Sequence, residues 1–281
     1  MNPRNFLSEI VARKRRTVAR LRAISKADVL RARAMEIRQN AAQHRLRETL
    51  NSISPTLKII AEFKRASPSV GIIRDDLSPA RVVRAYERGG ACAISVLTDE
   101  ESFGGSIADL SAVRASTRLP VLRKDFMVDP IQIYEAAIAG ADAILLIVAA
   151  LDDASLGELR KVAEDELGLD ALVEVHTTDE LRRALDIDAK IIGVNNRNLQ
   201  TFDVSVNTSE EVIADAPRDR LMLSESGLRD SEQLRHLHAL GFRGFLIGEA
   251  LMRAKNPEAA LRDLLGNADD RQIASHKDVL K

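Results

Sequence analysis

Eight short apolar segments recur between residues 58 and 247, and a longer segment with helical periodicity follows each of them. The apolar segments have the length and composition of buried strands and span residues 58–63, 91–97, 120–124, 143–148, 171–175, 190–194, 220–224 and 244–247. The predicted helices span 79–88, 107–116, 130–139, 152–167, 178–185, 209–216, 231–240 and 257–265. This alternation predicts βα units and a parallel sheet.

Residues at the ends of the predicted helices agree with these boundaries. A proline follows Ser78 and Asp129, where the first helical position would lie, and Gly89, Gly140 and Gly241 stand just past helix ends. Eight βα units are the content of a (β/α)8 TIM barrel. A doubly wound open sheet is the alternative, but the glycine fingerprint expected after its first strand is absent.

Residues 1–50 are predicted to form an N-terminal helical extension packed on the barrel, because they lack glycine and are rich in Ala, Leu and Arg. One apolar stripe is expected at Phe6, Ile10, Thr17, Leu21 and Ile24, widened by Leu7, Val11 and Val18. The other side is basic and fits either a nucleic-acid or membrane arm or a solvated face. The catalytic barrel would span 51–266 and a polar tail 267–281.

Composition removes several classes of function. A net charge of -1 and an aromatic content of 3% argue against binding to nucleic acid or to an anionic membrane. The single cysteine, Cys92, excludes an internal disulfide and a thiolate-rich zinc site, and the histidines lack metal-ligand spacing. No segment is apolar for the ~18 residues of a membrane span. We therefore expect a cytoplasmic protein without a metal.

The first predicted strand ends with a carboxylate and an ammonium group. Glu62 and Lys64 are two positions apart, so they point to the same side of the strand. The Ser-, Pro- and Gly-containing segment 65–77 follows and is predicted to be a loop that closes over them. Because a TIM barrel carries its active site at the C-terminal ends of its strands, this pair is a candidate for catalysis.

Other predicted strands also end in polar residues, as expected for an acid–base enzyme. These residues are Lys124, Glu174, His176, Asn195, Arg197, Ser226, Gly227, Gly248 and Glu249. Lys124 and Lys64 would donate protons and Glu62 and Glu174 accept them, and we expect a cation-rich mouth to lower the pKa of the lysine. His176 fits either an acid–base role or a helix cap.

Two strand ends have the features of a phosphate site. Ser226 and Gly227 precede one predicted helix, while Gly248 and Glu249 open another, so that backbone N–H groups could face an anion. Ordinary helix capping explains the same residues. Phe103 and Phe126 follow two other strands and would form either an apolar wall for a planar ring or part of the core.

The chain resembles the indole-3-glycerol phosphate synthase family of tryptophan biosynthesis. The resemblance runs from the N-terminal helices to about residue 265 and rests on seven motifs. These are IIAEFKRASPS at 59–69, SFGG at 102–105, LRKDF at 122–126, EVH at 174–176, GVNNRNL at 193–199, SESG at 224–227 and IG at 247–248.

The resemblance implies ring closure of 1-(2-carboxyphenylamino)-1-deoxyribulose 5-phosphate, with loss of carbon dioxide and water and without a cofactor. It implies that Lys124 is the general acid, that Glu174 accepts a proton in the later dehydration, and that Lys64 or Glu62 completes the set. Phosphate would bind at Ser226, Gly227, Gly248 and Glu249. The remaining substrate contacts would be Ser67, Phe103, Phe126, Leu145, Asn195, Arg197 and Leu246.

Glu249 departs from the resemblance, since many members have a small hydroxyl residue there. The resemblance also implies a phosphorylated small-molecule substrate. We expect the chain to be a monomer. Two rivals differ from it in testable ways. A related phosphate-binding barrel isomerase would need a cysteine base after the first strand, where Glu62 and Lys64 stand. A nucleic-acid-binding scaffold would lose its binding, and keep any activity, on removal of residues 1–45.

Overall fold

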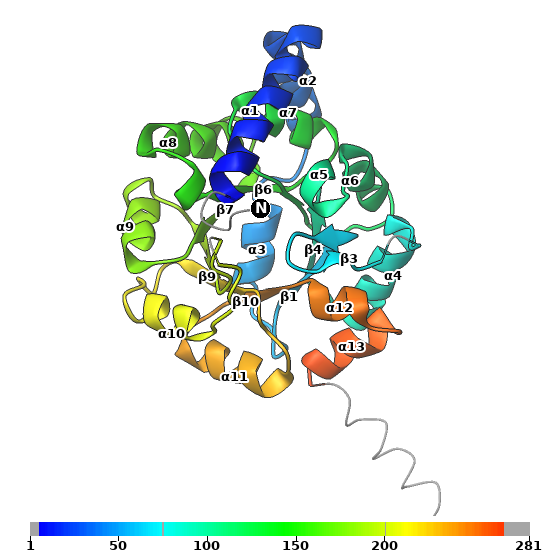
Figure 1. Ribbon diagram of the computed structural model, residues 1–281, viewed down its shortest axis with the longest axis vertical. Coiled ribbons are helices and arrows are strands. Elements are labelled where there is room, and N and C mark those ends of the chain that lie inside the picture. Colours follow the sequence, from blue (N-terminus) through cyan, green and yellow to red (C-terminus); the bar gives the residue numbers. More distant parts are fainter. Residues whose placement is uncertain (1–5, 75, 200, 267–281) are drawn as a thin grey trace, which may run out of the picture.

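A computed structural model describes residues 6–74, 76–199 and 201–266, and in it eight parallel strands close into a barrel (Figure 1). The strands are β1 (Ile59–Phe63), β4 (Ala93–Leu97), β5 (Val121–Lys124), β6 (Ala143–Ile147), β7 (Asp170–Val175), β8 (Ile191–Asn195), β9 (Leu221–Glu225) and β10 (Gly244–Ile247). The last strand pairs with the first, Leu246 lying opposite Ile60. The predicted TIM barrel is confirmed, and the open sheet is wrong.

Helices surround the barrel where the sequence predicts them, with ends that differ by no more than a few residues. They are α4 (Pro79–Gly89), α6 (Ile107–Arg114), α7 (Pro130–Ile138), α8 (Asp153–Lys161), α9 (Thr178–Asp186), α10 (Asn207–Ala214), α11 (Ser231–Leu240) and α13 (Pro257–Leu264). The predicted helix 152–167 changes to a π-helical turn, η3 (Val162–Glu166). Gly89 lies within the last turn of α4, and Gly90, with φ of 99°, caps it instead.

Several short elements were not predicted. They are the hairpin of β2 (Ala66–Ser67) and β3 (Gly71–Ile72), α5 (Glu100–Phe103), η2 (Val148–Ala150) and α12 (Glu249–Arg253). All of them except η2 lie in segments that the sequence analysis treats as loops. Elements of two to five residues are too short to show a hydrophobic periodicity. The hairpin lies within the expected closing loop, and α12 follows β10 at the candidate phosphate site.

Strand side chains alternate between the barrel interior and the layer under the helices. In β1, Ile59, Ala61 and Phe63 face the helices, whereas Ile60 packs inside the barrel. Glu62 follows the alternation of Ile60 and therefore points inward. The same rule carries Lys124 inward after Leu122, which also packs inside.

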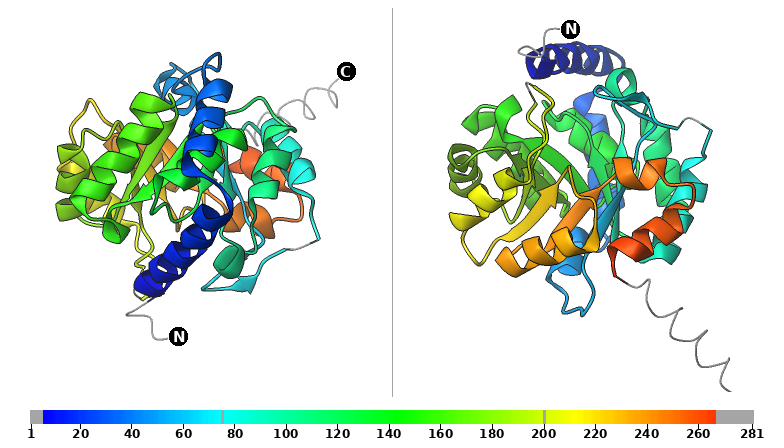
Figure 2. Two further views of the ribbon diagram at one scale, coloured as in Figure 1. Left: turned by 90° about the horizontal axis from the view of Figure 1, so that it is seen from above. Right: turned by 60° about the horizontal axis from the view of Figure 1, so that its bottom comes forward.

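Three N-terminal helices meet the barrel at different places (Figures 1 and 2). Helix α1 (Phe6–Ile24) crosses the C-terminal end of the strands, where Phe6 packs edge-on against Phe202. Helix α2 (Ala27–Arg38) packs along α7, outside the barrel. Helix α3 (Arg45–Asn51) closes the opposite end with Leu46 and Leu50. A division of the chain at residue 50 stays a prediction, and the predicted tail lies outside the described residues.

The predicted stripe on α1 is partly wrong. Phe6, Ile10, Val11 and Val18 are buried, but so is Lys14, while Ile24 is 83% exposed. Thr17 is also exposed and Leu21 only half-buried. The last turn of α1 extends past the barrel rim, which leaves Ile24 without a surface to cover (Figure 1). Lys14 replaces an apolar residue because two aspartates of the barrel face it.

Candidate active site

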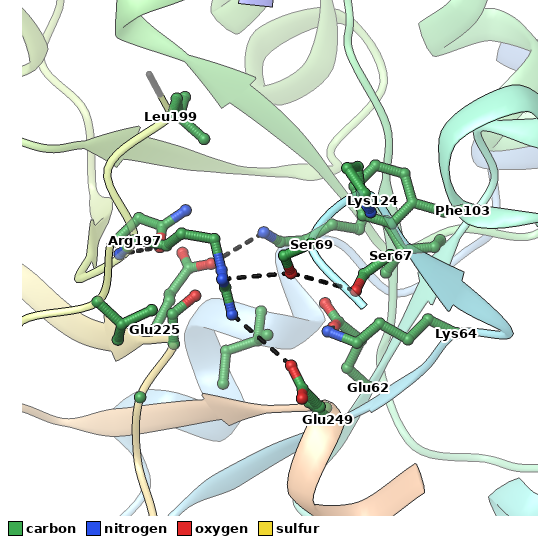
Figure 3. A pocket seen from close by; sticks show the side chains of 18 of the residues that line it. Glu62, Lys64, Ser67, Ser69, Phe103, Lys124, Arg197, Leu199, Glu225 and Glu249 are labelled. Atoms are coloured by element: carbon green, nitrogen blue, oxygen red, sulfur yellow. Dashed lines mark hydrogen bonds and ion pairs between the residues drawn. The ribbon is translucent and has the colours of Figure 1, made fainter. Parts of the chain in front are cut away.

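Helix α1 lies over the C-terminal ends of the strands (Figure 2), and a cavity of about 380 Å³ opens beneath it. Figure 3 shows side chains that line this cavity. All fifteen candidate site residues of the sequence lie in its lining: Glu62, Lys64, Ser67, Phe103, Lys124, Phe126, Leu145, Glu174, Asn195, Arg197, Ser226, Gly227, Leu246, Gly248 and Glu249. Because they come from all eight strands of the barrel and the loops after them, closure of the barrel is what brings them together.

Lys124 lies at the centre of a group of carboxylates. Its Nζ is 3.1 Å from Oε2 of Glu174 and 2.9 Å from Oε2 of Glu225. Burial disfavours the ammonium, but Glu174, Glu225 and Glu62 outweigh it and raise the pKa of Lys124 above its ordinary value. The expected lowering is wrong, because acidic rather than basic side chains surround this lysine. Lys124 is therefore charged at neutral pH.

Glu225 is a site residue that the sequence reading missed. It ends β9 and follows the inward-facing Leu221 and Leu223, so the two-residue alternation alone could have placed it. Burial raises the pKa of the Glu225 carboxyl to about 7, with Lys124 opposing the rise and Glu174 adding to it. A Cβ at Gly193 would come within 2.1 Å of Glu225 Oε1, so glycine at 193 leaves room for this carboxylate.

Glu174 remains ionised beside Lys124 despite its burial. Burial acts to raise its pKa, but the Lys124 ammonium, His176 and a hydrogen bond from Asn195 keep the pKa below its ordinary value. The two carboxylates next to Lys124 therefore differ, since the pKa of Glu225 is raised and that of Glu174 is lowered. Such a divided pair can hold and release protons at different stages of a reaction.

Glu62 and Lys64 form a second acid–base pair at the end of β1. Glu62 Oε1 lies 2.8 Å from Lys64 Nζ, and both side chains are largely buried. A Cβ at Gly248 would come within 2.3 Å of Glu62 Oε1, so glycine is needed there for packing as well as for any anion contact. The sequence prediction that both residues point into one cavity is confirmed.

Backbone N–H groups and arginines meet at the other side of the cavity. Ser226 and Gly227 follow β9 in consecutive left-handed conformations, with φ of 65° and 74°. Such a turn directs successive N–H groups toward one point and forms an anion-binding concavity. Gly248 precedes α12 at the same side, and Arg229 and Arg253, which the sequence reading did not select, also line this end.

Arg197 joins three segments around the cavity. Its guanidinium donates to Ser69 Oγ at 3.3 Å and to the carbonyl of Phe202 at 3.2 Å, and it lies 3.6 Å from Glu249 Oε2 (Figure 3). Glu249 also pairs with Arg253, 3.1 Å away. The side chain of Glu249 therefore holds two arginines rather than offering a donor to an anion.

The segment after β1 covers the mouth and is fixed at its base. Arg65 makes a bidentate pair with Asp109 at 2.6 and 2.7 Å, and its carbonyl accepts hydrogen bonds from the N–H groups of Ile73 and Arg74. At the tip, Ser69 reaches Arg197 across the cavity. Ser67, in β2, lies between base and tip and lines the cavity.

Aromatic and aliphatic side chains form the wall opposite the charges. The rings of Phe103 and Phe126 lie 6.5 Å apart between centroids, and Leu145 and Leu246 continue the apolar surface. Phe126 and Phe103 also pack with the barrel-interior cluster. The two phenylalanines therefore belong to the core and also line the cavity, and the binding of a planar ring against them stays a prediction.

His176 is not the cap of α9, so that interpretation is wrong. Thr177 is the N-cap, and its side chain accepts from the N–H of Glu180. The ring of His176 lies between two carboxylates: its Nδ1 is 3.1 Å from Glu180 and its Nε2 is 3.5 Å from Glu174. The opposing carboxylates overcome the effect of burial and raise the pKa of His176.

Helix α1 is held over the mouth by buried ion pairs. Lys14 Nζ lies 2.8 Å from Asp99 and 2.7 Å from Asp125, and Arg13 donates to Asp99 and to Ser102. Two basic residues of the N-terminal extension, Arg13 and Lys14, therefore act in packing. Cys92 is half-buried just before β4, at the opposite end of the barrel, and burial raises the pKa of its thiol to about 12.

A parallel eight-stranded barrel with a lysine–carboxylate cluster and an anion site at its C-terminal end defines a TIM-barrel enzyme with acid–base chemistry on a small molecule. A model of the indole-3-glycerol phosphate synthase family matches residues 7–264. The chain belongs to this family, the carboxy-lyases that form the indole ring in tryptophan biosynthesis. Its reaction converts 1-(2-carboxyphenylamino)-1-deoxyribulose 5-phosphate to indole-3-glycerol phosphate, carbon dioxide and water.

Among solved structures, thiamine phosphate pyrophosphorylase from Pyrococcus furiosus is similar, with a TM-score of 0.56 and 17% sequence identity over 84% of this chain and 100% of that one. At this identity the likeness shows the barrel fold alone. Across the described ranges, no group of three or more His, Cys, Asp or Glu could hold a metal ion. No helix in the same part of the chain has both the length and the apolar character needed to cross a membrane.

Proposed function

We propose that Lys124 is the general acid of the ring closure. The observation that carries the proposal is the position of its ammonium, largely shielded from solvent in the cavity between Glu174 and Glu225. Ring closure makes an alkoxide from the substrate ketone, and a buried ammonium can stabilise that charge and then protonate it. The raised pKa of Lys124 keeps the proton available in the free enzyme.

Glu174 takes a proton in the dehydration step of this proposal. While Lys124 is charged, it holds the pKa of Glu174 low. Once Lys124 has donated its proton, that attraction is lost, and Glu174 and Glu225 become stronger bases. The first proton transfer thus prepares the acceptor for the later one. Lys64 supplies the second proton, to the departing hydroxyl, while Glu62 keeps Lys64 in place at 2.8 Å.

The substrate spans the cavity from the anion site to the apolar wall. The phosphate binds to the backbone N–H groups at Ser226, Gly227 and Gly248, with positive charge from Arg197. The aromatic ring lies against the hydrophobic side chains of Phe103, Phe126, Leu145 and Leu246. Asn195 contacts a hydroxyl of the sugar part of the substrate. Ser67 contacts the substrate from the segment after β1 that covers the mouth of the cavity. Glu249 acts through the arginines that it holds rather than by contacting the phosphate.

Residues 1–50 form the helical extension over a barrel domain of residues 51–266 in this proposal. The chain works as a cytoplasmic monomer on a small phosphorylated substrate, without a cofactor, metal, nucleic acid or membrane. The net charge of -1 supports the exclusion of polyanions. Light scattering at assay concentration tests the oligomeric state, and a mass near twice that of the chain would contradict it.

Fluorescence of the indole product tests the reaction directly, since the protein contains no tryptophan. We expect emission to grow when purified protein is mixed with the carboxyphenylamino-deoxyribulose phosphate in buffer containing a metal chelator. The product is confirmed by its mass. Absence of emission from protein with the circular dichroism of a folded barrel would contradict the proposed function.

A further inference from the structure

The balance of the reaction requires the site to gain a proton in each turnover. The substrate carboxylate leaves as carbon dioxide without taking a proton. The ketone oxygen leaves as water and takes two protons, while formation of the indole double bond returns one. One proton per turnover must therefore come from solvent. This inference rests on the proposed function, because the count applies to that reaction.

A chain of titratable groups connects Lys124 to the protein surface on the side of α9. Lys124 lies 3.1 Å from Glu174, Glu174 lies 3.5 Å from His176 Nε2, and His176 Nδ1 lies 3.1 Å from Glu180. The exposed fraction of the side chains rises along this chain, from 2% at Glu174 to 13% at His176 and 19% at Glu180. Each member can bind a proton, and the 3.5 Å step between Glu174 and His176 is the one step of this series that is not a hydrogen bond.

His176 and Glu180 do not line the substrate cavity. Substrate in the cavity would lie beneath α1 and the cover formed by residues 65–74, in which Ser69 reaches Arg197 across the mouth. Access to Glu174 from behind the cavity wall is independent of that cover. Nε2 of His176 has no hydrogen-bond partner among the described residues, and it faces Glu174.

We propose that His176, with Glu180 at its outer side, is the route by which the active site regains the proton consumed in each turnover. A proton enters at Glu180 or at Nδ1 of the imidazole, and a proton leaves Nε2 for Glu174. Glu174 then passes it to the neutral amine of Lys124, 3.1 Å away. Lys124 and Lys64 each give one proton to the substrate in a turnover and Glu174 takes one from it, so these three groups together end the turnover one proton short, and the proton from His176 makes up that difference. No bond other than the N–H and O–H bonds changes, and the imidazole returns to its first state when it exchanges its proton with solvent.

The charges around His176 favour transfer at the right stage. Glu180 on α9, Glu174 on β7 and Glu225 on β9 all face the ring and raise the pKa of His176, against the effect of burial. While Lys124 is charged, Glu174 is a weak base and the proton stays on the imidazole. After Lys124 has given up its proton, Glu174 becomes the better acceptor.

The test is the buffer dependence of kcat in a His176→Gln variant. Glutamine keeps a polar side chain of similar reach but cannot carry a proton. We expect kcat to fall by about tenfold at pH 8 and the loss to shrink toward pH 6, where hydronium is more abundant. Added imidazole at constant pH and ionic strength should restore part of kcat, as a mobile carrier replaces the fixed one.

The matched control is His236→Gln. His236 also pairs with a glutamate, Glu210, at 3.0 Å, but it lies on the outer surface of the barrel in α11. This variant should keep wild-type kcat and show no response to imidazole. A Glu180→Gln variant should show a smaller loss than His176→Gln, because solvent can still reach the imidazole.

Two results would overturn the proposal. One is a His176→Gln variant with wild-type kcat at pH 8. The other is a loss of kcat that neither pH nor imidazole changes, which would assign His176 only to the orientation of Glu174. Both comparisons use a wild-type enzyme that forms indole-3-glycerol phosphate. Failure of the proposed function would instead appear as inactivity of the wild type itself.

Discussion

The two ends of the barrel use charged residues in opposite ways. At the end closed by α3, charges lie around the rim and pair with fixed partners, such as Arg45 and Arg114 on Asp142 at 2.8 Å. The interior there is filled by Leu46 and Leu50. At the other end, Lys124 forms ion pairs with two carboxylates, those of Glu174 and Glu225, inside the cavity. One end pairs its charges to hold the structure, while the other keeps charges that can exchange protons.

This difference separates stability from catalysis in space. Leu46 and Leu50, at the α3 end of the barrel interior, contribute to folding and do not line the cavity. Burying the charges at the cavity end costs solvation energy, and the ion pairs that they form there offset this cost only in part. Their arrangement is therefore better explained by catalysis than by stability. Substitutions at the two ends should therefore act on different measured quantities.

The largest effect is expected from Lys124→Met. Methionine keeps the length of the side chain but provides no proton, so kcat/KM should fall by about four orders of magnitude. The variant should remain folded, because Glu174 and Glu225 can take up protons once the ammonium is gone. Steady-state indole fluorescence and circular dichroism measure the two properties, and near-wild-type turnover would remove Lys124 from its role.

Leu50→Ala should give the opposite result. Leu50 is almost fully buried, and its Cδ2 packs against Gly244 at the start of β10. Removing three carbon atoms should lower the free energy of unfolding by about 2 to 5 kcal/mol. Urea unfolding measures this change, and kcat/KM at 25 °C should stay within about twofold of wild type. A large loss of activity in folded protein would break the separation of the two ends.

A smaller effect, visible in pH profiles, is expected from Glu225→Gln. In the wild type, Glu225 takes a proton as the pH falls through about 7, so Lys124 loses one of its anionic partners and kcat/KM should fall. Glutamine is neutral throughout, so this inflection should disappear and leave a lower, flatter profile, reduced about tenfold at pH 8. An unchanged inflection near pH 7 would assign it to another group.

The same substitution has a stability signature. The folded-state pKa of Glu225, about 7, lies above its ordinary value of 4.5, so the folded state binds more protons between these values. Its contribution to stability is therefore present below pH 4.5 and is lost as the pH rises through 7. Relative to Glu225→Gln, the wild type should become less stable from pH 5 to pH 8. Urea unfolding at both values checks this sign.

The barrel could be predicted from the sequence because each βα unit carries its own local signals. Apolar strand segments, prolines at helix starts and glycines at helix ends each depend only on residues that are close together in the sequence. The inward direction of Glu62 and Lys64 followed from strand alternation. The prediction of which α1 residues are buried was partly wrong. Their burial depends on where the barrel rim ends and on the two aspartates that pair with Lys14.

The candidate site could be predicted as a set of residues but not as an electrostatic system. Strand ends identified Lys124 and Glu174, yet the pKa of Lys124 moves opposite to expectation because its neighbours come from other strands. Glu225 was missed because the strand was read as ending at Ser224. The pairing of His176 with Glu180 needs the first turn of α9, which the sequence does not place beside the ring.

The most direct test of the central claim is a single turnover with enzyme in excess over substrate, comparing Lys124→Met with Lys58→Met. Lys58 lies at the α3 end, where its Nζ donates to the carbonyl of Leu50 at 2.6 Å. We expect Lys58→Met to form indole-3-glycerol phosphate at the wild-type rate and Lys124→Met to bind substrate without forming product in that time. Product formation by Lys124→Met at the wild-type rate would contradict the account.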